Sequence, residues 1–328
     1  MNAAPHKRNL IVAGLTLFAL VMIVAAYFSP IWWVSLTAPN YPKDAFPDGI
    51  RIHFHFDGVY NGCRAAGKGT RQAAEILEKD IDHTVERYNP VTDAKKDVNK
   101  GAEGLDCVHE MNTINHYVGM FPIATGAPVE KPLAKFFFGF FAVMLLAFAI
   151  PKKKPRLAVL VAGFAAVAGW MLVHQYALGH LETHVAQYVQ ETGTFFKEPE
   201  KIAVWGDNVR RVSHLVIAGL IVAMLVVVAG VARFRQFSLL LALVPALLPV
   251  FFVITYAGWL WFFGHNLHPW GAFTVKPFMP TVFGEGKVAQ FSTYSYPYWG
   301  YGLLVLAMLA LLLALVIRRK QIKDGAVD

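Results

Sequence analysis

A stretch of twelve residues, HEMNTINHYVGM from His109 to Met120, carries side chains that could bind a soft metal ion. If this stretch is helical, its metal-binding side chains recur at steps of three or four residues and line one face: His109, Asn112, His116 and Met120. Imidazole and thioether groups together favour copper, particularly Cu(I), over metals that prefer oxygen ligands. The spacing therefore predicts that His109, His116 and Met120 form the centre of a copper site or of the contact with a copper enzyme.

Two other structures are open for the same stretch. A strand would place His109 beside Met111, which is again a soft pair of ligands. In a purely structural interpretation, Asn115, His116 and Tyr117 hydrogen-bond a turn that leads into the next helix, and the methionines are ordinary apolar contacts.

A second pair of histidines, His180 and His184, is separated by one helical turn in the run HQYALGHLETHVAQYVQ. Two imidazoles at this spacing can hold one metal ion. Exposed histidines on an amphipathic helix would give the same pattern, so the pair alone does not decide between ligation and solvation. We expect His180 and His184 to add ligands to the copper site.

Two further pairs of histidines lie in other segments. In DGIRIHFHFDGVYNG, apolar and polar residues alternate, which predicts a strand with His53 and His55 on one face. That face could hold a metal or could be the polar outer face of a small sheet. His265 and His268 could add ligands from a segment rich in aromatics and proline, which we interpret as an interfacial loop or as a docking surface for a soluble partner.

The composition places these histidines in a membrane protein. Hydrophobic residues make up 56% of the chain and charged residues 16%. Six apolar runs have about the 20 residues that a helix needs to cross a bilayer: Asn9–Phe28, Leu133–Ile150, Leu157–Tyr176, His214–Ala232, Phe237–Phe263 and Trp299–Ile317. The first run is longer than the core of a signal peptide, so we expect an uncleaved anchor, with a cleaved leader as the alternative.

The orientation follows from the basic residues of the short connections, which all fall on one side: Lys7, Arg8, Lys152, Lys153, Lys154, Arg156, Arg233, Arg235, Arg318, Arg319, Lys320 and Lys323. The positive-inside rule makes this side the cytoplasm, with both termini. Residues 29–132, 177–213 and 264–298 then face outward, and every histidine except His6 lies in or beside them. Because these clusters supply much of the net charge of +8, we do not expect nucleic-acid binding.

The chain contains two cysteines, Cys63 and Cys107, both in the first outward segment. We predict that they form a disulfide, since an oxidising compartment lets disulfides persist. Free thiolates in a metal site are the alternative. The stretch between them, residues 67–104, is polar and reads as a solvated helix and loop.

The runs YPKDAFPDGIRI, INHYVGM and PFMPTVFGEGKVAQFSTYS resemble the NosB-type multi-span membrane proteins encoded beside clade II nitrous oxide reductase, the clade that exports its enzyme through the Sec route. The resemblance implies a bacterial inner membrane, a periplasmic main domain and a periplasmic copper enzyme as partner. The long insert between Cys63 and Cys107 departs from the shorter segment expected of that family.

Three functions remain open. The first is a non-catalytic accessory protein that binds copper, docks a periplasmic copper enzyme, or does both, in support of its metal or electron supply. The second is a quinol-oxidising subunit in which His174 and His214, on neighbouring helices at similar depth, ligate haem b. The third is a membrane copper oxidoreductase. The chain has no CxxCH, Walker, nucleophile-elbow or HExxH motif.

The expected fold is an all-α membrane bundle of six transmembrane helices, with a small mixed α/β extracytoplasmic domain between the first two. Residues 1–28 form the cytoplasmic N-terminus and the first helix, residues 29–132 the periplasmic domain, and residues 133–328 a five-helix membrane domain with two periplasmic loops, 177–213 and 264–298. Only helices and closed barrels satisfy the backbone in lipid, and the long apolar runs exclude a barrel.

Overall fold

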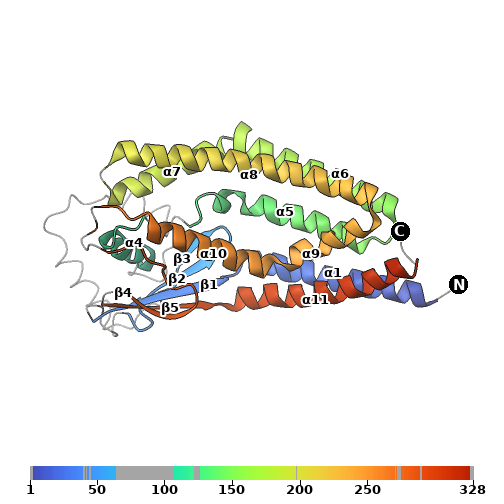
Figure 1. The fold of residues 1–328 in the computed structure, drawn as a ribbon, viewed down its shortest axis with the longest axis horizontal. Helices are drawn as coiled ribbons and strands as arrows, with labels where there is room; N and C mark the ends of the chain where they lie inside the picture. The colour runs from blue at the N-terminus through green and yellow to red at the C-terminus, as the bar shows by residue number, and fades with distance from the viewer. Residues whose placement is uncertain are drawn as a thin grey trace. The chain divides into compact units, whose positions relative to one another are not determined.

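The computed structural model describes residues 3–39, 41, 43, 46–63, 106–121, 126–196, 198–269, 271, 275–288 and 290–325. The polar stretch 67–104, with His83, and Trp270 lie outside the described residues. The chain divides into two compact units. We call Met1–Ser29, Ala127–Tyr256 and Trp299–Asp328 the helical unit, and Pro30–Gly126 and Ala257–Tyr298 the sheet unit (Figure 1).

Among the described residues, six helices are long and apolar enough to cross a membrane, as the sequence predicts. They are α1 (Ala3–Tyr27), α5 (Glu130–Ala149), α6 (Lys153–Leu172) with the π-helical turn η2 (Val173–Ala177), α8 (Pro199–Arg233), α10 (Leu248–His265) and α11 (Trp299–Lys323). Helix α7 (His180–Phe195) packs on α8. With the exception of α10, which the two units share, these helices belong to the helical unit.

One predicted span, Phe237–Phe263, is divided. It starts within the 3₁₀ turn η3 (Arg235–Leu239) and continues through the short helix α9 (Leu240–Ala246) into α10. Pro245 lies inside α9 and Leu247 adopts φ −83° and ψ 4° at the end of that helix. Proline lacks the amide hydrogen that continues a helix, and its ring crowds the preceding turn, so the apolar run breaks here.

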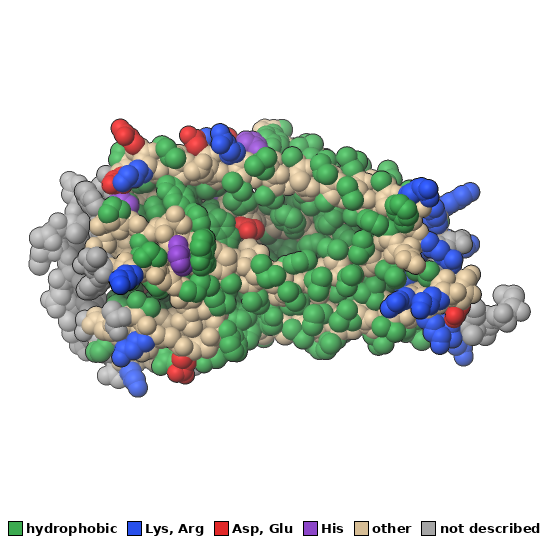
Figure 2. Space-filling view, in the orientation of Figure 1, with side chains coloured by type: hydrophobic (Ala, Val, Ile, Leu, Met, Phe, Trp, Pro, Cys, Tyr) green, Lys and Arg blue, Asp and Glu red, His purple; other side chains and the backbone are tan. Residues whose placement is uncertain are grey.

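Arg318 joins three helices of the helical unit. Its side chain is 1% exposed. The guanidinium donates to Asn9 Oδ1 of α1 at 3.1 Å, to the carbonyl oxygen of Phe148 in α5 at 3.1 Å, and to Gln321 Oε1 of its own helix at 3.2 Å. Figure 2 shows lysine and arginine gathered at the end of this unit where the chain termini lie, and apolar side chains along the helices. From the sequence, Arg318 was counted among the basic residues of the short connections at this end. In the structure it is instead buried between helices.

The sheet unit contains a five-stranded antiparallel sheet with the order β3-β2-β1-β5-β4. The strands are β1 (Trp32–Thr37), β2 (Ile50–His55), β3 (Gly58–Asn61), β4 (Gly284–Val288) and β5 (Phe291–Pro297). The predicted strand at His53 and His55 is therefore confirmed. The segment 264–298, interpreted from the sequence as a loop, instead supplies two strands, and residues 292–297 of β5 pair with all six residues of β1.

Helix α4 (Cys107–Tyr117) covers one face of the sheet. The buried core between them has eight members: Leu36, Phe46, Ile50, Ile52, Val59, Cys107, Met111 and Ile114. Cys63 follows β3 and is joined to Cys107 at the start of α4, with a Cα–Cα distance of 6.0 Å. The predicted cysteine pair is confirmed, and it fastens the helix to the edge of the sheet.

Candidate functional site

Helix α4 begins and ends at identifiable caps. The side chain of Asp106 accepts hydrogen bonds from the amides of Val108 and His109. At the other end, the amide of Gly119 donates to the carbonyl of His116 at 2.9 Å, and that of Met120 donates to Asn115 at 2.8 Å. Gly119 has φ +80°, so the chain leaves the helix before Met120. His109, Asn112 and His116 thus share the helix, while Met120 follows a turn.

The methionines of this stretch are both buried. Met111 is 3% exposed and belongs to the core beneath the sheet, whereas His109 lies on the exposed part of α4. A helix turns about 100° per residue, so positions 109 and 111 face different ways, and the strand that would pair them is not formed. Met120 is also 3% exposed. Met111 therefore makes the apolar contacts that the structural interpretation expects, and its role as a ligand stays a prediction.

His268 lies beside the end of α4. Its amide donates to the carbonyl of Gly119 at 2.7 Å, and the residue is 8% exposed. Burial, and then the neighbouring His268, lower the pKa of His116. A lowered imidazole pKa keeps the ring neutral at pH 7, which is the form that binds metals. The structure therefore brings His116, Met120 and His268 into one part of the sheet unit, although His268 is about 150 residues further along the chain.

His265 is held differently from His268. Its Nδ1 contacts the carbonyl of Trp261 at 2.8 Å, and its ring stacks on that indole at 4.5 Å. Both contacts lie within one helical turn of α10, so His265 is bound to its own helix.

The predicted pair on α7 contacts two different partners. The ring of His180 stacks on that of His174, with centroids 3.9 Å apart, while His184 Nε2 lies 2.7 Å from the carbonyl oxygen of Pro128. Gly179 precedes α7 with φ +69°, and this left-handed residue turns the chain between η2 and α7. His180 and His184 belong to the helical unit and the His116 group to the sheet unit, so a shared site stays a prediction.

The predicted haem ligands each have a neighbour. His174 Nε2 lies 2.6 Å from Lys135 Nζ, and His214 Nδ1 lies 2.8 Å from the Tyr176 hydroxyl. Tyr176 and His174 are both on the π-helical turn, a feature often found at functional sites. An axial haem ligand needs a free imidazole nitrogen, so His174 would bind iron through Nδ1 or after displacement of Lys135. Lys135 was not predicted as a neighbour of His174, and it lies near the start of an apolar span.

His53 and His55 share a sheet face, as predicted, but each ring contacts a different tyrosine: His53 is stacked on its partner and His55 is tilted against its partner. His53 lies 5.0 Å from the ring of Tyr298, and His55 lies 4.5 Å from that of Tyr60. Burial, with the Arg51 guanidinium nearby, lowers the pKa of His53 to about 4. Arg51 itself lies over the Trp33 ring at 4.2 Å. The face is therefore aromatic and cationic, which the alternating tyrosines of FSTYSYPY would have indicated had β5 been predicted.

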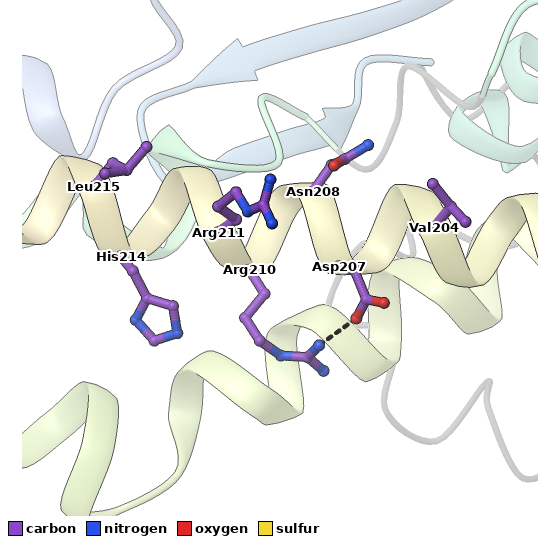
Figure 3. A pocket seen from close by; sticks show the side chains of 7 residues that line it. All are labelled: Val204, Asp207, Asn208, Arg210, Arg211, His214 and Leu215. Atoms are coloured by element: carbon purple, nitrogen blue, oxygen red, sulfur yellow. Dashed lines mark hydrogen bonds and ion pairs between the residues drawn. The ribbon is translucent and has the colours of Figure 1, made fainter.

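A hollow of about 550 Å³ lies along the first part of α8 (Figure 3). Its lining comes from one helix: Val204, Asp207, Asn208, Arg210, Arg211, His214 and Leu215. Arg210 binds Glu182 of α7 through Nε at 3.0 Å and forms an ion pair with Asp207. These charged residues were not among the predicted functional residues.

Within the part of the chain that the structure describes, no three His, Cys, Asp or Glu side chains come together as a metal-binding group. The soft-ligand group of His116, Met120 and His268 contains only two residues of those types. Searches of protein-family models, curated proteins and solved structures give no match for this chain.

Proposed function

We propose that the chain is a membrane-anchored, non-catalytic accessory protein that binds copper and docks a periplasmic copper enzyme, nitrous oxide reductase. In this proposal it lies in a bacterial inner membrane with both termini in the cytoplasm and the sheet unit in the periplasm. The single observation that carries the proposal is the pairing of Gly119 with His268, which gathers His116, Met120 and His268 from two distant segments.

The donor set of this group fits copper. Two imidazoles and one thioether suit Cu(I), and the lowered pKa of His116 leaves its lone pair available at neutral pH. His116 and His268 would hold the ion together with Met120. When bound, copper supplies either a metal ion for transfer or a one-electron redox centre. The residues of the chain position it and limit its contact with water, since Met120 and His268 are both buried.

The orientation is supported by two independent features. Basic residues gather at the end of the helical unit that carries both termini, as the positive-inside rule requires of a cytoplasmic end. The joined pair Cys63 and Cys107 is typical of an oxidising compartment.

Metal analysis of the full chain, purified in mild detergent and loaded with Cu(I) under anaerobic conditions, tests the proposal. We expect about one copper per chain, lost in His116→Ala and weakened in Met120→Leu. His265→Ala is the matched control, because His265 contacts only its own helix turn among the interactions given above. If the His116→Ala variant retains copper at the wild-type level, copper does not bind at the proposed site.

A second candidate function, a quinol-oxidising subunit with haem b, is supported by the place of His174 and His214. Tyr176, two residues after His174, contacts His214 between η2 and α8. A Soret band in the purified protein that disappears in His174→Ala would select this function. Copper-dependent turnover of a substrate without any partner protein would instead favour a membrane copper oxidoreductase.

A further inference from the structure

Helix α8 is longer than a bilayer requires. Its 35 residues, Pro199–Arg233, extend about 52 Å at 1.5 Å per residue, whereas the hydrocarbon layer is about 30 Å thick. The charged residues of its first part end at Arg211, and residues 212–232 contain none. Those 21 residues extend about 32 Å. The boundary between headgroups and hydrocarbon therefore falls next to Arg211, inside the hollow of Figure 3.

The residues that line this hollow divide between two sides of α8. In Figure 3, Arg211 and Asn208 point to one side, with Val204 and Leu215, while Arg210, Asp207 and His214 point to the other. The side chains on the side of Arg210 already have partners: Arg210 binds Glu182 and Asp207, and His214 contacts Tyr176. Among the described residues, Arg211 has no ion pair or hydrogen bond to another side chain, and it is exposed.

The side of Arg211 continues as an apolar stripe along the helix. Leu215, Val222 and Val226 follow Arg211 at intervals of four, seven and four residues, which keeps them on one face. They are 65%, 56% and 54% exposed. Arg211 and Asn208 thus lie in the headgroup layer at the end of an exposed apolar stripe. This arrangement is complementary to a phosphate that is joined to acyl chains.

We propose that this side of α8 binds one glycerophospholipid. The Arg211 guanidinium donates two hydrogen bonds to the non-bridging phosphate oxygens, the Asn208 amide donates a third, and an acyl chain lies along Leu215 and Val222. A planar guanidinium matches a phosphodiester in a way that a point charge does not. The neighbouring charges of Arg210, Glu182 and Asp207 sum to about −1, so Arg211 is the group that attracts the phosphate.

Native mass spectrometry of the full chain in mild detergent tests this inference with a defined phosphatidylglycerol as probe. We expect one lipid retained per wild-type chain and about tenfold weaker retention in Arg211→Ala, equivalent to loss of a charge-assisted hydrogen-bonded pair. Arg211→Lys should lose less. Arg233→Ala, an exposed arginine at the other end of α8, is the matched control and should retain the lipid as wild type does.

Two competitors distinguish the possible sources of the phosphate. Diacylglycerol, which lacks the phosphate, should not displace the bound lipid, and inorganic phosphate at millimolar concentration should not displace it either. Leu215→Asn, which alters the apolar stripe alone, should weaken lipid retention severalfold. Displacement by inorganic phosphate, or equal retention by the Arg211→Ala and Arg233→Ala variants with unchanged melting temperatures, would overturn the inference.

Discussion

Gly119 connects α4 to the segment that carries His268. Its φ of +80° lies in the left-handed region, and a Cβ at this position would lie 2.5 Å from the His268 carbonyl oxygen. Gly119→Ala should therefore lower the free energy of unfolding by about 2 kcal/mol or more and weaken copper binding at His116. Thermal unfolding and copper titration of the purified variant measure the two effects.

Gly284→Ala is the control for that substitution. Gly284 has φ +91°, but a Cβ there would meet no atom within 4 Å. This variant carries the backbone strain without the collision with His268, so it should lose about 1 kcal/mol of stability and keep its copper affinity. Equal copper loss in both variants would show that the contact with His268 does not position the site.

His53 should make the sheet unit sensitive to acid. Its pKa of about 4 in the folded state lies below the ordinary 6.5 of an unfolded chain. The unfolded state therefore binds more protons between pH 6.5 and pH 4, and stability falls as the pH falls through this window. Discounted for partial exposure, the loss is about 1–2 kcal/mol. Melting temperatures at pH 7 and pH 4.5 should converge more closely in His53→Gln than in the wild type, and an identical drop in both would exclude His53 as the cause.

The sequence predicted which histidines lie on a strand and which lie on a helix. It did not predict the side chains that those histidines contact. The alternation at His53 and His55 predicted the strand and the shared face. The stacking of His53 on Tyr298 depends on β5, which joins the sheet from more than 200 residues away. The HxxxH spacing likewise predicted a helix at His180 and His184, whereas the left-handed Gly179 decides that His180 meets His174.

At the scale of elements, the disulfide is the link between β3 and α4. Cys63 and Cys107 are 44 residues apart, and a loop of that length predicts a stabilisation of about 4 kcal/mol from chain entropy. Both thiols should resist alkylation until the protein is reduced, and reduction should lower the melting temperature of the sheet unit. Immediate alkylation of both cysteines in the native oxidised protein would restore the alternative of a thiolate metal site.

The helix ends near the termini depend on Arg318. Replacing this buried arginine by leucine leaves the Phe148 carbonyl without its donor and leaves Asn9 Oδ1 with only the Gln321 amide, so we expect a loss of about 3 kcal/mol. Arg319→Leu, one residue further along α11, changes an exposed arginine and should alter stability by less than about 0.5 kcal/mol. Melting temperatures in one detergent provide the comparison, and equal stabilities would contradict a structural role for Arg318.

The six long helices could be predicted because each depends on a local property, a run of about 20 apolar residues. The sequence prediction of one continuous fifth span took no account of Pro245, which lies inside α9. The pairing of β1 with β5 could not be predicted from the sequence, because it joins segments that are distant in the chain and have no common pattern. The sheet unit is thus assembled from both ends of the sequence.

At the scale of the whole molecule, every functional proposal depends on the orientation in the membrane. If the six candidate helices of the described residues all cross the membrane, both termini lie on one side, and the proposed orientation assigns that side, with its basic clusters, to the cytoplasm. A reporter fused after Gln321 should therefore behave as cytoplasmic, and one inserted near Lys95, outside the described residues, as external. Paired alkaline phosphatase and fluorescent-protein fusions read the two sides in opposite senses. The reverse pattern would place the sheet unit with His116 and His268 in a reducing compartment, where neither the disulfide nor contact with a periplasmic copper enzyme is expected.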